Sequence, residues 1–117
     1  MLFALGQTVA TPGALELMAR CEVEPQALLH RHSTGDFGTA GHYNDILPNL
    51  TPEELTHGVL ATSDDGKINA LAIKFGEGRV CSYYPIQDNS RGHTWKVWVI
   101  TYLGEGGDTT LLLPEEY

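Results

Sequence analysis

Histidine and arginine are concentrated in the stretch His30-Arg31-His32, inside a segment with helical spacing. On a helical wheel His32 falls between Leu28 and Leu29, whereas His30 points the opposite way. Histidine titrates near neutral pH, so His32 is a candidate general acid or base. The alternative is a histidine of the core or its rim, with ring nitrogens satisfied by hydrogen bonds. Both interpretations place His32 on the core-facing side of a helix.

Metal chemistry finds little support in the residue pattern. His30 and His32 are two positions apart, so they do not share a helix face and cannot hold one ion between them. His42 would have to complete such a site through a loop. The two cysteines, Cys21 and Cys81, lie far apart and form no Cys-x-x-Cys pair. We therefore expect no metal site and no cofactor, and two buried, reduced thiols.

A second group of polar side chains lies on predicted strands. Ser82 and Tyr84 share one face of a strand, and Arg79 projects to the other face unless a bulge intervenes. Thr101 lies on the next predicted strand, and Thr109 begins the last one. An arginine with several hydroxyl groups suits a phosphate or another anion. The alternative is packing, because threonine is a common strand residue.

Capping signals and apolar spacing predict the helices that carry or precede these residues. Thr11-Pro12 opens one helix, and the capping box Thr51-Pro52-Glu53-Glu54 opens another. The segment from Ser63 to Gly76 fits a helix that ends at the glycine, although Ile68 to Ala72 also alternates as a strand would. We expect helices at residues 12–21, 25–33, 51–61 and 63–75, with a loop at 35–49.

The last third of the chain has the pattern of strands. Runs at 80–84, 94–102 and 109–113 are separated by turn-rich gaps. The run 94–102 is apolar on both faces, which is typical of an inner strand. The predicted fold is a single α+β domain in which N-terminal helices, about 11–76, pack on one face of a small C-terminal antiparallel sheet. That sheet, about 78–114, is expected to have three to four strands.

The net charge of the chain limits the classes of molecule that it is expected to bind. The chain has 117 residues, with 7 basic and 15 acidic side chains, which gives a net charge of −8. A negative field repels phosphate backbones, which argues against DNA binding by the first two predicted helices, although they resemble a helix-turn-helix. It suits solubility, a basic protein partner or mimicry of nucleic acid. The apolar start is too short for a signal peptide, and no run is long enough to span a membrane, so we expect a cytoplasmic protein.

Several motifs together resemble a family of short proteins encoded on plasmids and integrative conjugative elements. These motifs are Leu28-Leu29-His30-Arg31-His32, Gly35-Asp36-Phe37-Gly38, Asn69-Ala70-Leu71, Gly78-Arg79-Val80-Cys81-Ser82-Tyr83-Tyr84, Lys96-Val97-Trp98-Val99-Ile100-Thr101 and the ending Thr109 to Tyr117. The resemblance implies a mobile-element origin, without an established activity. The chain departs from the family pattern at Phe37, at Tyr102, in the loop 104–108 and in an insertion around 42–62.

A weaker likeness is to barnase/RelE-like ribonucleases, which cleave RNA by metal-free acid–base chemistry. It implies that His32 is the acid or base, that Arg79 holds the phosphate, and that Thr101 or Thr109 is the auxiliary hydroxyl. The loop 104–108 lacks the arginine that relatives of the mobile-element family carry there, which weakens the case for catalysis.

The expected function is that of an accessory protein that binds a host or element-encoded protein through an acidic surface. Candidate binding residues are Arg31, Ser82, Tyr84 and Trp98. The alternative is a metal-independent barnase/RelE-like ribonuclease, or a catalytically decayed relative, for which RNA would be the partner. Small-ligand binding and regulatory DNA binding remain open, and the sequence does not set the oligomeric state.

Overall fold

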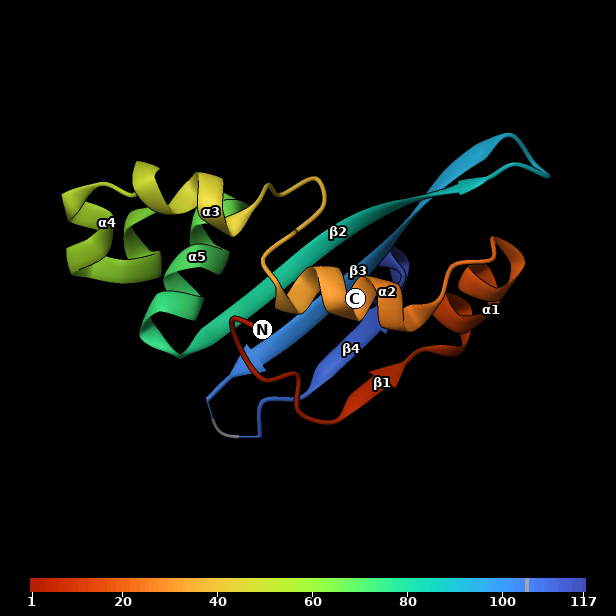
Figure 1. Cartoon of the computed structure of the whole chain (residues 1–117), viewed down its shortest axis with the longest axis horizontal. Helices are drawn as coiled ribbons and strands as arrows, with labels where there is room; N and C mark the ends of the chain where they lie inside the picture. Colours follow the sequence, from red (N-terminus) through yellow and green to blue (C-terminus); the bar gives the residue numbers. More distant parts are fainter. Residues whose placement is uncertain (105) are drawn as a thin grey trace.

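The computed structural model describes residues 1–104 and 106–117 and has an α+β architecture (Figure 1). In chain order the elements are β1 (Thr8–Ala10), α1 (Pro12–Arg20), α2 (Pro25–Ser33), α3 (Tyr43–Ile46), η1 (Leu47–Asn49), α4 (Pro52–His57), η2 (Gly58–Ala61), α5 (Asp65–Phe75), β2 (Gly78–Asp88), β3 (His93–Leu103), β4 (Thr109–Leu112) and η3 (Pro114–Glu116). None of the helices in the described residues is long and apolar enough to span a membrane.

The four strands form one mixed sheet in the order β1-β4-β3-β2. β3 is an inner strand, as its apolar residues on both faces predict. β1 pairs with β4 in parallel, and the other two pairs are antiparallel. The prediction of a purely antiparallel C-terminal sheet, with every strand after the helices, is therefore wrong. β1 was missed because its three residues show no alternation and its partner strand is at the far end of the chain.

Helices α1 and α2 cover one face of the sheet and form the main core with it (Figure 1). Both helices lie where the sequence predicts them. The Thr11 hydroxyl accepts a hydrogen bond from the Ala14 amide and so caps α1. The core joins Ala14, Leu17, Met18, Leu28 and Leu29 of the helices to Tyr84, Ile86, Val97, Val99 and Leu111 of the strands.

Helices α3, α4 and α5, with η1 and η2, form a lobe beside the first part of β2 (Figure 1). The helical interpretation of residues 63–75 is confirmed: Asp64 caps α5, and Gly76 ends it in the left-handed conformation. The predicted helix at 51–61 is a capped α4 that continues as η2. The predicted loop at 35–49 is wrong in its second half, because Tyr43 and Ile46 pack against α5 and order α3.

The outer edge of β2 is covered at Cys81 and Tyr83 by other segments of the chain. The Asn69 side chain pairs with both the N–H and the C=O of Cys81, at 2.8 and 2.7 Å, and so takes the place of a neighbouring strand. The Phe37 carbonyl and the Thr39 amide pair with Tyr83 in the same way. Residues 37–39 can come this close to β2 only because residue 38 is glycine: a Cβ atom at Gly38 would overlap the Tyr83 carbonyl. Covered edges protect a sheet from pairing with other chains.

Candidate functional site

His32 lies at the centre of a row of buried side chains between α2 and the sheet. Its Nδ1 is 2.6 Å from Ser82 Oγ on β2, and its Nε2 is 2.9 Å from Thr101 Oγ1 on β3. Thr101 Oγ1 is 2.6 Å from Thr109 Oγ1 on β4, which donates to the Leu5 carbonyl at 2.6 Å. All four side chains have 0% exposed surface. The row crosses three strands and ends at the N-terminal segment.

The terminal carbonyl sets the direction of the hydrogen bonds that connect Leu5 to His32. A carbonyl oxygen can only accept, so the Thr109 hydroxyl donates its one proton to the Leu5 carbonyl. Thr109 must therefore accept the hydrogen bond from the Thr101 hydroxyl. Thr101 then has no proton left for His32, so the His32 Nε2–H is the donor. The geometry therefore places a proton on Nε2, and in the neutral ring Nδ1 accepts from the Ser82 hydroxyl.

Burial keeps the His32 ring uncharged at neutral pH. Desolvation lowers the pKa of His32 to about 4, so the ring is neutral at pH 7. The ring of Phe3 packs edge-on against the imidazole, with 5.2 Å between the ring centroids. A general acid or base must come within hydrogen-bonding distance of its substrate. In this fold both nitrogens of His32 are used by Ser82 and Thr101, and Phe3 covers the ring.

Arg79 lies on the opposite face of the sheet from His32. It alternates along β2 with Val80, a residue of the helix-covered face, and its Nη1 donates to the Tyr117 hydroxyl at 2.9 Å. The structure thus brings His32, Thr101 and Thr109 together and places Arg79 behind them, across the sheet. A phosphate held by Arg79 would be separated from His32 by the strands themselves.

Arg31 and Tyr84 hold the loop that follows α2. Arg31 Nε is 2.6 Å from Asp36 Oδ2, and its guanidinium lies 4.5 Å from the centroid of the Tyr84 ring. The Tyr84 hydroxyl donates to the Asp36 carbonyl at 2.6 Å. The hydrogen bond from Arg31 is the main cause of a lowered pKa for the Asp36 carboxyl. Of the four predicted binding residues, Ser82 and Tyr84 are buried within the fold, and Arg31 anchors the loop.

Trp98, the fourth predicted binding residue, lies on the face of the sheet that α1 and α2 leave uncovered. We call this surface the open face. Its residues are Arg79, Cys81, Tyr83, Lys96, Trp98, Ile100, Tyr102, Thr110 and Leu112 of the strands, with Tyr117 folded over them. Trp98 packs edge-on against Tyr83 and Tyr117, and Tyr102 and Tyr117 are 56% and 57% exposed. Sequence reasoning missed Tyr102 and Tyr117, although the alternation Trp98-Ile100-Tyr102 was a usable signal.

The lobe exposes a second apolar surface. Leu60 is 93% exposed and Phe75 is 50% exposed, and Leu55 and Val59 are also exposed. Leu60, Val59 and Phe75 line a hollow of about 360 Å³ together with His57, Leu71 and Glu77. We call this surface the lobe patch. The sequence predicts a helix with an apolar face at 51–61, but it does not show whether that face is buried or exposed. The lobe patch was therefore missed.

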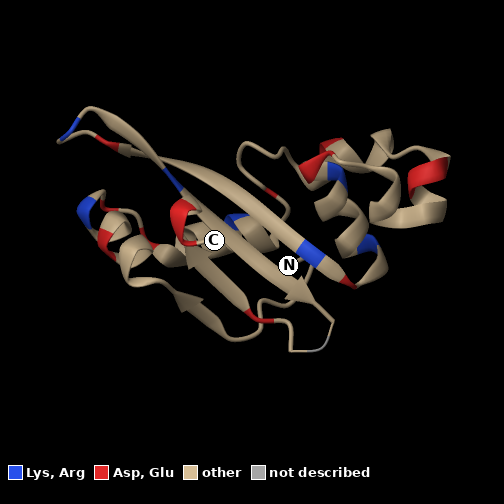
Figure 2. Cartoon of the chain, turned by 180° about the vertical axis from the view of Figure 1, so that it is seen from behind, with Lys and Arg blue, Asp and Glu red and all other residues tan. Residues whose placement is uncertain are grey.

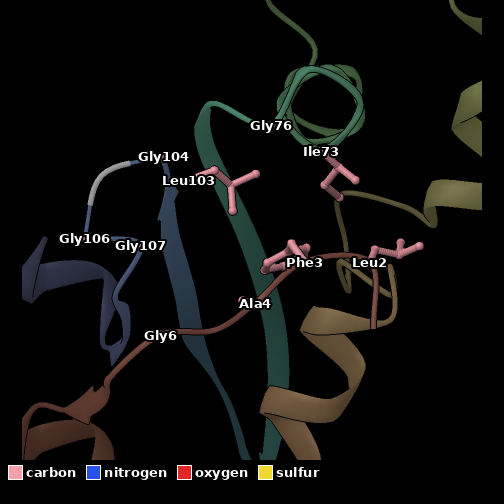
Figure 3. Close-up of a pocket in the computed structure, with 10 residues that line it drawn as sticks. All are labelled: Leu2, Phe3, Ala4, Gly6, Ile73, Gly76, Leu103, Gly104, Gly106 and Gly107. Atoms are coloured by element: carbon pink, nitrogen blue, oxygen red, sulfur yellow. The ribbon is translucent and has the colours of Figure 1, made fainter.

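A larger hollow, of about 490 Å³, lies between the N-terminal segment and the turn after β3 (Figure 3). The side chains of Leu2, Phe3, Ile73 and Leu103 line it, together with the backbone of glycines such as Gly104 and Gly107. The described residues that line this hollow carry no titratable side chain, so they supply no acid–base group. Its relation to His32 is indirect, through Phe3.

No grouping for a metal ion is found in the described part of the chain, where three or more His, Cys, Asp or Glu side chains nowhere converge. Both cysteines are free, and Cys81 is buried. Burial raises the pKa of the Cys81 thiol, which makes the thiolate scarce at neutral pH.

Comparisons with known proteins were negative: no family model, no curated protein and no solved structure matches this chain. Three features of the structure bear on function: the buried row around His32, the open face and the lobe patch.

Proposed function

We propose that this chain is an accessory protein that acts by binding another protein, and that the lobe patch is the contact surface. The single observation that carries the proposal is the exposed apolar surface of Val59, Leu60 and Phe75 around a hollow of about 360 Å³. A contiguous exposed apolar surface on a folded protein is typical of an interaction site. A hollow of this kind suits one apolar anchor residue from a partner.

Charge around the lobe patch supports a basic partner. Residues 43–77 contain six acidic side chains and two basic ones, and one of the basic ones, Lys67, pairs with the buried Glu54 at 3.1 Å. Glu77 lines the hollow, and Glu53 is exposed one helical turn before His57, another lining residue. A basic, amphipathic helix would place apolar residues on the patch and Lys or Arg beside these carboxylates.

The mobile-element resemblance suggests where such a partner comes from. A protein of the host, or one encoded by the element itself, would fit an accessory role. The ribonuclease alternative has weaker support, because His32 is buried and Arg79 lies on the opposite face of the sheet.

A peptide probe tests the charge and the shape of the lobe patch together. The probe is a fluorescein-labelled helical peptide of Lys and Leu, compared with a Glu and Leu peptide of the same pattern. We expect the full chain to bind the basic peptide and not the acidic one in fluorescence anisotropy, and Leu60→Ser to weaken binding about tenfold. Tyr102→Ser, an exposed change on the open face, is the matched control and should bind as the wild type does.

The same variants identify a natural partner. Wild type, Leu60→Ser and Tyr102→Ser would be used to capture proteins from a host lysate, and a protein lost only with Leu60→Ser would be purified for calorimetry. Equal affinity of that protein for wild type and Leu60→Ser would rule out the lobe patch as the contact surface. Equal binding of both peptides would remove the argument from charge.

A further inference from the structure

The open face has a charge pattern unlike that of the whole chain. On the described strands, the side chains directed to this face are Val9 of β1, Arg79, Cys81, Tyr83, Pro85 and Gln87 of β2, Thr94, Lys96, Trp98, Ile100 and Tyr102 of β3, and Thr110 and Leu112 of β4. None of these is acidic, in a chain with net charge −8. The acidic residues Glu115 and Glu116 lie in η3, which is next to β4 and is drawn red beside the label C in Figure 2.

The same face is built like the centre of an interface. Tyr102 and Tyr117 expose more than half of their surface, and they line a hollow of about 240 Å³ together with Ile100, Thr110, Leu112 and the acidic Glu116. The indole N–H of Trp98 is buried and has no acceptor among the described residues. Aromatic side chains with few charges between them are enriched in the buried centres of protein interfaces.

We propose that the open face binds the open face of a second copy of this chain, about a twofold axis that runs parallel to the strands. The argument is charge complementarity across the width of the sheet. Lys96 lies on β3, at the level where β4 ends, and Glu115 lies just beyond that end. A twofold axis along the strands lays the β2–β3 side of one copy over the β4 side of the other.

The strand register gives the closest pair in this arrangement. Trp98 is opposite Leu112, so Lys96 lies at the level of Pro114, where η3 begins. The twofold axis keeps this level, so each Lys96 faces the exposed Glu115 of the other copy. Tyr102, six residues along β3 from Lys96 on the same face, then lies in the interface beyond the charge pairs.

The size of the face sets the expected affinity. Three strands about 4.8 Å apart give a footprint of a few hundred Å² per copy, which is at the low end for specific interfaces. Each copy also carries a net charge of −8, and this opposes association. A dimer with a dissociation constant in the micromolar range is the expected result.

Sedimentation equilibrium of the full chain at micromolar concentrations tests the proposal. Wild type should form a dimer and nothing larger, and Tyr102→Asp should be monomeric. Lys96→Glu and Glu115→Lys should each weaken the dimer about fivefold or more, because each brings like charges together twice. The double variant Lys96→Glu/Glu115→Lys should restore the wild-type affinity.

The three substituted positions are exposed, and circular dichroism would confirm that each of the four variants is folded. Leu60→Ser, on the lobe patch, is the control and should dimerise as the wild type does. A wild type that stays monomeric would overturn the proposal, and so would assemblies larger than a dimer. A double variant that remains as weak as the single ones would overturn the proposed axis.

Discussion

His32 and Thr101 are joined across the core by a hydrogen bond of 2.9 Å between Nε2 and Oγ1. The two residues are 69 positions apart, and the bond fixes α2 on the middle of the sheet. Its direction follows from the Leu5 carbonyl at the end of the row. His32, which the sequence indicates as a candidate acid or base, therefore has a structural role: it links α2 to the sheet.

Replacing Thr101 with valine should destabilise the protein. The change keeps the shape of the side chain but leaves the buried His32 Nε2–H without an acceptor, which costs about 1–3 kcal/mol. Thr94→Val on the same strand removes only an exposed hydrogen bond to Gln87, so it should cost less than about 0.5 kcal/mol. Urea unfolding of both variants makes the comparison. Similar losses in the two would mean that Thr101 is not a buried partner of His32.

Stability should fall at acid pH because of His32. Its pKa is about 4 in the folded state and 6.5 in the unfolded state, so the unfolded state binds more protons below pH 6.5. The free energy of unfolding is therefore unaffected by His32 titration above about pH 6.5. It falls by roughly 3 kcal/mol as the pH falls to about 4.

His32→Gln isolates this effect, because acidic groups such as Asp36 titrate equally in both proteins. The difference in free energy of unfolding between wild type and His32→Gln should shrink between pH 6.5 and 4. Nitrogen-15 NMR of the imidazole should show the proton on Nε2 at pH 7. A His32 that titrates near pH 6.5, or that carries its proton on Nδ1, would contradict the assignment.

Asn69→Leu should destabilise the sheet at its β2 edge. Asn69 satisfies both the N–H and the C=O of Cys81, and leucine leaves both groups unpaired, which costs about 2–4 kcal/mol. Asn49→Leu removes an exposed hydrogen bond to the Asp45 carbonyl and should cost less than about 1 kcal/mol. Urea unfolding measures the two losses, and hydrogen exchange should be faster at the Cys81 amide in Asn69→Leu alone. Unchanged protection of that amide would show that Asn69 does not cover the edge.

Wild-type protein should not cleave RNA in the absence of metal ions. His32 has no exposed surface, and Arg79 is on the other face of the sheet, so one scissile phosphate cannot reach both. A fluorogenic RNA substrate with EDTA gives the measurement. Cleavage that disappears in both His32→Gln and Arg79→Gln would restore the ribonuclease hypothesis.

Much of the helical structure was predictable because its signals are local. The Thr11 cap, the Thr51–Glu54 capping box and the Gly76 stop are hydrogen bonds or backbone conformations within about one helical turn. The inner position of β3 follows from its own apolar residues on both faces. In each case the residues that decide the structure are neighbours in the chain.

The candidate site was predictable only as a set of residue types. Local patterns in the sequence predict which helix carries His32, which of its sides faces the core, and that Ser82 and Arg79 point to opposite faces of β2. The fold is needed to show that Thr109 and Leu5, 104 positions apart, orient the row around His32. It is also needed to show that β1 joins the sheet in parallel and that Leu60 and Tyr102 stay exposed. A cap or a helical period depends on residues within one turn, whereas strand pairing and exposure depend on which distant segment packs there.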